Sequence, residues 1–300
     1  MQFAEDVERA RRVADLLLRA WQDEGVFGRR EMPEDALPVR VERGSEAHLR
    51  FITLTVAIDY MRDADALWLS GRQTLADPAT AWLYEPEAVA AAGIGAVIDA
   101  MQVHGLSKKP TQDAQTWQSV STTLARHFLG EVGVLLRRAR FDAPGLLALL
   151  RDRTLVPGFP FLRGPKIGPL WIRMLHDNCA VALERLERIP LPVDIHTAAA
   201  TLQLACVRAE PYSGDFAPLR EAIQRVWRQA LEGTGHYPLQ LDEPLWHLSR
   251  AGCRVTRTWP CEFQAQCPVG ALCGASRARL STGGADGQGE ARMWVDGSDG

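Results

Sequence analysis

The 300-residue sequence lacks a hydrophobic run long enough to cross a membrane. The apolar stretch at residues 88–98 is followed by Asp99 and is too short for a bilayer. Residues 1–20 also do not match a cleavable signal peptide. They carry acidic side chains where a signal peptide has basic ones, and their apolar residues have the spacing of an amphipathic helix. We therefore expect a cytoplasmic protein with no membrane partner.

The sequence also lacks an overall excess of positive charge, since its net charge is −3. The charge is nevertheless uneven: residues 101–175 contain eleven Lys or Arg and four Asp or Glu, a local balance of +7. A protein that binds phosphates needs such a patch. A solvated helix face would have the same composition, and charge alone does not separate the two interpretations.

A run of alternating polar and apolar residues, the pattern of a strand, is missing as well. Apolar residues recur instead at three- and four-residue steps, which predicts an all-α fold. Residues 51–70 are apolar enough for one core helix, although their β-branched start leaves a strand possible. Residues 155–165 predict a Pro- and Gly-rich hairpin between helices, and residues 276–300 are poor enough in apolar residues to predict a disordered tail.

The predicted hairpin ends in Gly164 and Pro165, directly before a helix that begins near Lys166. Free backbone N–H groups at such a helix start can bind phosphate. A lysine there, at the positive end of the helix dipole, can serve as a nucleophile that forms a Schiff base. An ordinary surface lysine beside a turn would look the same in the sequence.

A second candidate lies in residues 190–207, where Asp194 precedes another predicted helix. Asp is a common helix N-cap, which is one interpretation. The other is a carboxylate held ionised by helix N–H groups, able to stabilise positive charge on a sugar or to activate a nucleophile. His196, two residues further on, either contacts phosphate or packs.

Six cysteines are present, and four of them fall within 21 residues. The two isolated ones, Cys179 and Cys206, have apolar helical surroundings and are expected to be buried. In a cytoplasmic protein a cluster of four indicates metal ligation rather than disulfides. The close Cys-x2-Cys pairs that are usual in zinc sites are absent. The clustered cysteines are Cys253, Cys261, Cys267 and Cys273.

Taken in order, these motifs resemble the helix-hairpin-helix DNA glycosylase superfamily. Residues 164–166 (Gly-Pro-Lys) are similar to the end of its hairpin, and residues 193–196 (Val-Asp-Ile-His) to its aspartate motif. The Cys-Pro-x4-Cys step at residues 267–273 and the Trp-x3-Arg run at residues 246–250 are similar to the iron–sulfur region of the endonuclease III branch. The resemblance covers residues 51–274.

The sequence departs from the family pattern at three places. The hairpin has one glycine, Gly164, where the family has two, and Phe161 lies among the residues before it. Lys166 and Asp194 are 28 positions apart, which is longer than in endonuclease III and is similar to archaeal 8-oxoguanine glycosylases. The cysteine spacing, Cys-x7-Cys-x5-Cys-x5-Cys, is also longer than in the family.

The resemblance implies a DNA glycosylase fold with two helical subdomains and a cleft between them. Residues 1–49 would be an N-terminal helix and linker that pack with the cluster subdomain, residues 50–185 a six-helix barrel, and residues 186–275 the subdomain with the aspartate and the cluster. A monomer is expected.

The resemblance also implies a function, the excision of a damaged base from double-stranded DNA after the nucleotide flips out of the duplex. Lys166 and Asp194 would be catalytic, with AP lyase activity through a Schiff base, and the protein would be nucleoid-associated. The four cysteines would hold a [4Fe–4S] cluster, with zinc as the alternative. Two other classes stay open: a non-catalytic DNA-binding protein of this fold, and a zinc-stabilised helical interaction protein. The implied DNA-binding residues are Leu162, Arg163, Gly164 and His196.

Overall fold

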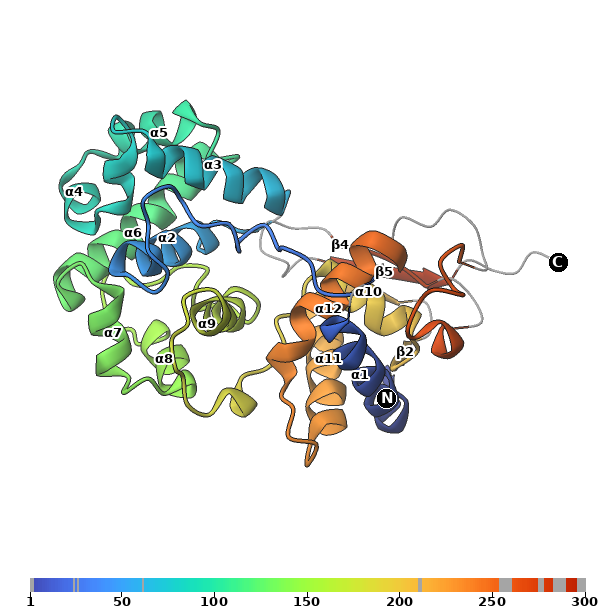
Figure 1. Cartoon of the computed structure of the whole chain (residues 1–300). Coiled ribbons are helices and arrows are strands. Elements are labelled where there is room, and N and C mark those ends of the chain that lie inside the picture. The colour runs from blue at the N-terminus through green and yellow to red at the C-terminus, as the bar shows by residue number, and fades with distance from the viewer. Residues whose placement is uncertain are drawn as a thin grey trace. The chain divides into compact units, whose positions relative to one another are not determined.

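The computed structural model describes residues 3–23, 25, 27–60, 62–209, 212–253, 261–274, 278–282 and 290–295. The chain divides into two compact units (Figure 1). Unit 1 contains residues 1–30 and 189–300, and unit 2 contains residues 31–188. Both are mainly helical, so the all-α class is confirmed at that level. None of the helices in the described part of the chain combines the length and hydropathy needed to cross a bilayer.

The described residues of unit 2 form helices and one isolated β-bridge, with no strand. Its elements are α2 (Glu46–Val56), α3 (Ala64–Ala76), η1 (Ala81–Tyr84), α4 (Pro86–Ala91), α5 (Ile94–Val103), α6 (Pro110–Phe128), α7 (Val132–Arg138), α8 (Ala143–Leu150), α9 (Ile167–Asp177) and η2 (Leu186–Arg188).

The single helix predicted at residues 51–70 is wrong, because the structure has two helices there. α2 ends at Val56, and α3 begins after Asp63, whose carboxylate accepts the backbone N–H of Ala66 at 2.9 Å. An aspartate in that position favours a helix start over a helix interior. The break leaves a turn between α2 and α3, whose described residues include Tyr60 and Arg62.

The segment at residues 31–45 belongs to unit 2, whereas the sequence assigned it to the subdomain with the cysteines. Two polar contacts hold it against α9. Glu34 forms a buried ion pair with Arg173, and the Asp35 carboxylate accepts a hydrogen bond from Asn178 at 2.7 Å. Breaking a buried ion pair on one side leaves an uncompensated charge, so these contacts tie the segment firmly to unit 2.

Helices α8 and α9 flank the predicted hairpin and pack closely against each other. Gly168, in the first turn of α9, is the point of closest approach. A Cβ at this position would lie 2.7 Å from the Leu162 carbonyl oxygen and 3.0 Å from the Leu147 Cδ2 atom. Only glycine lets the hairpin backbone and α8 come this near to α9.

Unit 1 combines the N-terminal helix with the last third of the chain. Its elements are β1 (Phe3–Glu5), α1 (Val7–Gln22), α10 (Ile195–Gln203), β2 (Val207–Ala209), β3 (Tyr212–Asp215), α11 (Phe216–Leu231), η3 (Pro238–Leu241), α12 (Asp242–Leu248), the π-helical turn η4 (Ser249–Cys253), η5 (Gly270–Leu272), β4 (Ala278–Thr282) and β5 (Glu290–Val295).

Two small antiparallel sheets differ from the sequence expectation. β1 pairs with β2, and β5 pairs with both β3 and β4. The expected disordered tail is thus wrong for residues 278–282 and 290–295, which form strands. β5 pairs with β3, whose paired residues lie 75–81 positions earlier in the chain, and the composition of the tail does not reveal this pairing.

We predict that Gly168→Ala destabilises unit 2 by about 1–3 kcal/mol, because the added methyl group cannot fit beside the Leu162 carbonyl. Gly95→Ala is the matched control. It lies in α5 with no atom within 4 Å of the new Cβ, and should be neutral or stabilise by up to about 1 kcal/mol. Thermal unfolding followed by circular dichroism measures both. Equal midpoints for the two variants would contradict the assigned packing.

Candidate active site and cysteine pocket

Lys166 is the N-cap residue of α9, directly after the hairpin, as the sequence predicts. Its side chain is half-buried, and its Nζ donates a hydrogen bond to the Asp59 backbone carbonyl at 3.3 Å. Asp59 lies in the turn between α2 and α3, more than 100 positions earlier. The amine is therefore held within unit 2 instead of extending freely into solvent.

The chain has only three lysines, Lys108, Lys109 and Lys166. Two of them lie beside the same turn, since the Lys109 Nζ is 5.0 Å from the centre of the Tyr60 ring. Lys108 is exposed. The scarcity of lysine beside 31 arginines leaves few amines that could form a Schiff base.

The other predicted hairpin residues have different surroundings. The Leu162 side chain is fully buried, so only its backbone could contact DNA. Arg163 is exposed, and Gly164 is packed so tightly that a Cβ would lie 2.8 Å from the Phe161 carbonyl oxygen.

Residues 101–175 contain eleven cationic side chains. Arg173 is buried in its ion pair with Glu34 and cannot contribute to a positive surface patch, while eight others are exposed. The exposed ones are Lys108, Arg126, Arg137, Arg138, Arg140, Arg151, Arg153 and Arg163.

Asp194 is the N-cap of α10, and its Oδ1 accepts the backbone N–H groups of His196 at 2.8 Å and Thr197 at 2.9 Å. No described residue donates a hydrogen bond to Oδ2. The two interpretations of this residue are thus compatible: one oxygen caps the helix and fixes the carboxylate, and the other can act on a ligand. Asp194 lies in unit 1 and Lys166 in unit 2.

His196 contacts the ring of Trp246, with the ring centres 5.5 Å apart. The Arg250 guanidinium lies 4.8 Å from the centre of the same Trp246 ring. Trp246 and Arg250 are the two residues of the Trp-x3-Arg run, one on α12 and one on the following π-helical turn. The packing role expected for His196 is therefore observed, and its contact with phosphate stays a prediction.

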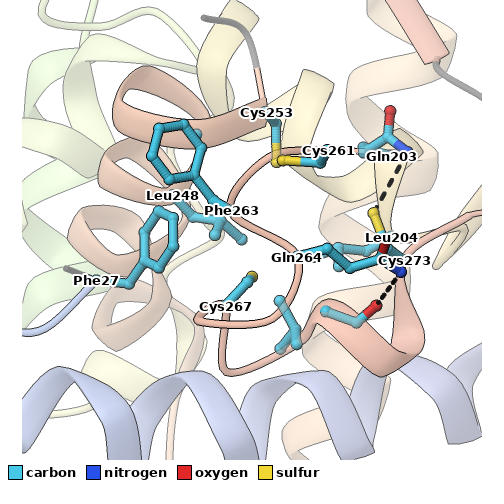
Figure 2. Close-up of a pocket in the computed structure, with 13 residues that line it drawn as sticks. Phe27, Gln203, Leu204, Leu248, Cys253, Cys261, Phe263, Gln264, Cys267 and Cys273 are labelled. Carbon is cyan, nitrogen blue, oxygen red and sulfur yellow. Dashed lines mark hydrogen bonds between the residues drawn. The ribbon is translucent and has the colours of Figure 1, made fainter. Parts of the chain in front are cut away.

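All four clustered cysteines line one pocket of unit 1 (Figure 2). Phe27, Leu248 and Phe263 lie together on one side of it. The Gln203 amide, at the end of α10, donates a hydrogen bond to the Cys273 Sγ at 3.5 Å. The sequence did not point to Gln203 or Phe27, because both lie far from the cysteines along the chain.

Burial raises the pKa values of Cys253, Cys267 and Cys273. Desolvation raises the pKa of Cys253, and the charges of the other three cysteines raise it further. Burial raises the pKa of Cys267 to about 11, and it also raises that of Cys273. Four thiolates could share this pocket only beside a compensating cation, and soft sulfur donors suit iron–sulfur clusters and zinc. The donor set thus fits both cofactors that the sequence suggested.

The loop that presents the cysteines depends on Gly270. A Cβ there would lie 2.1 Å from the Gln264 carbonyl oxygen, which no side chain could tolerate.

Within the described residues, no group of three or more His, Cys, Asp or Glu side chains is arranged as the ligands of one metal ion. By contrast, Cys179 and Cys206 are buried apart from the pocket, and burial raises the pKa of each to about 12.

No protein-family model matches the chain, and no curated protein is significantly similar to it. The assignment of a function therefore depends on the residues and their geometry.

We predict that Cys267→Ser lowers the iron or zinc content of the purified protein to background, because a serine hydroxyl is a poor ligand for a soft metal site. Cys206→Ala is the matched control: it removes a buried thiol of the same unit that does not line the pocket, and should keep the full metal content. Elemental analysis of anaerobically purified protein gives the answer. Equal metal content in wild type and Cys267→Ser would contradict the assignment.

Proposed function

We propose that this protein is a base-excision DNA glycosylase of the helix-hairpin-helix class with AP lyase activity, in which Lys166 is the nucleophile and Asp194 the assisting carboxylate. The observation that carries the proposal is Lys166 itself. It is a half-buried lysine at the start of α9, held by the Asp59 carbonyl, in a chain with only two other lysines.

The hairpin supports DNA binding at this place. Gly168 allows the backbone of the hairpin to approach α9 closely, and Gly164 allows a tight turn within the hairpin, where a Cβ would lie 2.8 Å from the Phe161 carbonyl oxygen. Exposed Arg151, Arg153 and Arg163 lie in or beside the hairpin and can neutralise phosphates. Contacts of this kind position a protein on the duplex without reading its sequence.

The chemistry needs a neutral amine. The Lys166 Nζ attacks C1′ of the flipped nucleotide, the bond from C1′ to the base nitrogen breaks, and the electron pair leaves with the base, which takes up a proton. The amine loses its protons as the sugar ring opens, giving a Schiff base. Removal of a proton from C2′ then expels the 3′ phosphate by β-elimination.

Asp194 supplies a fixed negative charge. Positive charge builds on the sugar as the base departs, and a carboxylate already oriented by two helix N–H groups stabilises it without reorganisation. This role requires the ionised form.

The four pocket cysteines, Cys253, Cys261, Cys267 and Cys273, are the residues that would hold an iron–sulfur cluster, or zinc in the alternative. When bound, such a group would cross-link the loop at residues 261–273 to Cys253 at the end of η4. The residues of this chain that perform the reaction lie elsewhere, so the cluster would be structural.

We predict that Lys166→Gln abolishes borohydride trapping of the protein on DNA that contains an abasic site, because glutamine cannot form a Schiff base. Lys108→Gln is the control; it removes an exposed lysine and should trap as wild type does. Denaturing gel electrophoresis detects the covalent complex. Persistent trapping by Lys166→Gln would show that another amine reacts, and no trapping by wild type would sink the lyase proposal.

We predict that Asp194→Asn lowers the rate of base excision by at least about 100-fold while DNA affinity is retained. Asparagine can still accept the two N–H groups that cap α10, so the helix is preserved. Asp215→Asn is matched to it, since Asp215 caps α11 in the same way by accepting the Ala217 N–H at 3.0 Å. Single-turnover excision over a panel of oxidised, deaminated, mismatched and alkylated bases tests this. Equal rates for the two variants would remove Asp194 from the mechanism.

A further inference from the structure

The turn between α2 and α3 contains a network of contacts that the proposed mechanism does not yet use. Its centre is Tyr60, whose side chain is almost fully buried. The Tyr60 ring stacks on the ring of Phe161, with centres 4.4 Å apart and planes inclined by 11°. Phe161 belongs to the hairpin, five positions before Lys166. The stack therefore joins the turn to the hairpin directly.

The Tyr60 hydroxyl donates a hydrogen bond to the Asp113 carboxylate in the first part of α6. Asp113 is buried, and its other oxygen accepts hydrogen bonds from the Ser107 hydroxyl at 2.7 Å and from the backbone N–H groups of Lys108 and Lys109 at 3.1 and 3.0 Å. The Arg62 guanidinium lies 3.9 Å from the same oxygen. A carboxylate with this many donors is a rigid anchor.

The backbone at both ends of the stack is constrained. Phe161 has φ of 61°, a left-handed conformation that is strained for a residue with a large side chain. Such a conformation persists only where its surroundings hold it. Next to Tyr60, the Asp59 carbonyl accepts the hydrogen bond from the Lys166 Nζ. Lys166 is thus held from two sides, through the hairpin by Phe161 and through its amine by Asp59.

We propose that Tyr60, anchored by Asp113 and stacked on Phe161, is a positioning residue that holds the Lys166 amine for attack. The catalytic part of this proposal rests on the proposed function of Lys166. Tyr60 itself touches no reacting atom. A nucleophile held in one orientation avoids a large part of the entropy cost of the reaction, and a displacement of about 1 Å can cost about 100-fold in rate.

The test compares Tyr60→Phe, which removes the hydrogen bond to Asp113 and keeps the ring, with Phe161→Leu, which removes the stack. Tyr84→Phe is the matched control. Tyr84 is also buried in unit 2, and its hydroxyl forms a hydrogen bond with Thr55 at 3.1 Å, without any contact to Lys166 or Asp59. Thermal unfolding midpoints establish that each variant is folded.

The first readout is acylation of Lys166 by a small amine-reactive reagent, followed by mass spectrometry in the absence of DNA. With three lysines in the chain, the modified site is readily resolved. We expect Lys166 to react faster in Tyr60→Phe and Phe161→Leu than in wild type, because the amine is released from Asp59. Tyr84→Phe should react as wild type does.

The second readout is borohydride trapping under single-turnover conditions on DNA with an abasic site. We expect Tyr60→Phe and Phe161→Leu to lower the trapping rate constant by about tenfold, with the dissociation constant for DNA changed by less than about twofold. Acylation and trapping that match Tyr84→Phe in both variants would overturn the proposal. If wild type does not trap at all while acylation responds as expected, the proposed function fails and the positioning of Lys166 stands.

Discussion

A buried carboxylate is costly to fold unless hydrogen-bond donors and positive charge surround it, and Asp113 meets this requirement with groups from two parts of unit 2, the turn between α2 and α3 and residues 107–109. The Tyr60 hydroxyl, the Ser107 hydroxyl and the backbone at the start of α6 all donate to it. The turn between α2 and α3 is fixed as a result, and through Phe161 so is the hairpin. The position of Lys166, the candidate nucleophile, therefore depends on the hydrogen bonds that accompany the burial of Asp113.

Helix α10 has a comparable role in unit 1. Its first turn orients Asp194, and its last residue, Gln203, reaches the sulfur of Cys273. Arg9, from α1, donates a hydrogen bond to the Leu204 carbonyl at 2.6 Å and another to the Leu272 carbonyl, so it ties the end of α10 to the cysteine loop. Any group that orders the cysteine loop therefore also restrains α10, the helix that carries Asp194. This gives the cysteine pocket a structural meaning that does not require it to take part in chemistry.

Local patterns predicted the features that depend on neighbouring residues. The helix start at Lys166, the N-cap at Asp194 and the hairpin between two helices follow from Gly, Pro and Asp at short spacing. The sequence did not reveal contacts between distant positions. Tyr60 and Asp113 are 53 residues apart, and Glu34 and Arg173 are 139 apart, so neither contact gives a repeating pattern in the sequence. The same reason explains the missed strand β5 near the C-terminus, whose paired residues in β3 lie 75–81 positions earlier.

The close approach of the hairpin to α9 needs a residue without a side chain. Gly168, in the first turn of α9, meets that need, because a Cβ there would lie 2.7 Å from the Leu162 carbonyl oxygen. Phe161, in the hairpin, has a strained φ of 61°, and its stack on the Tyr60 ring is a contact that can hold this conformation.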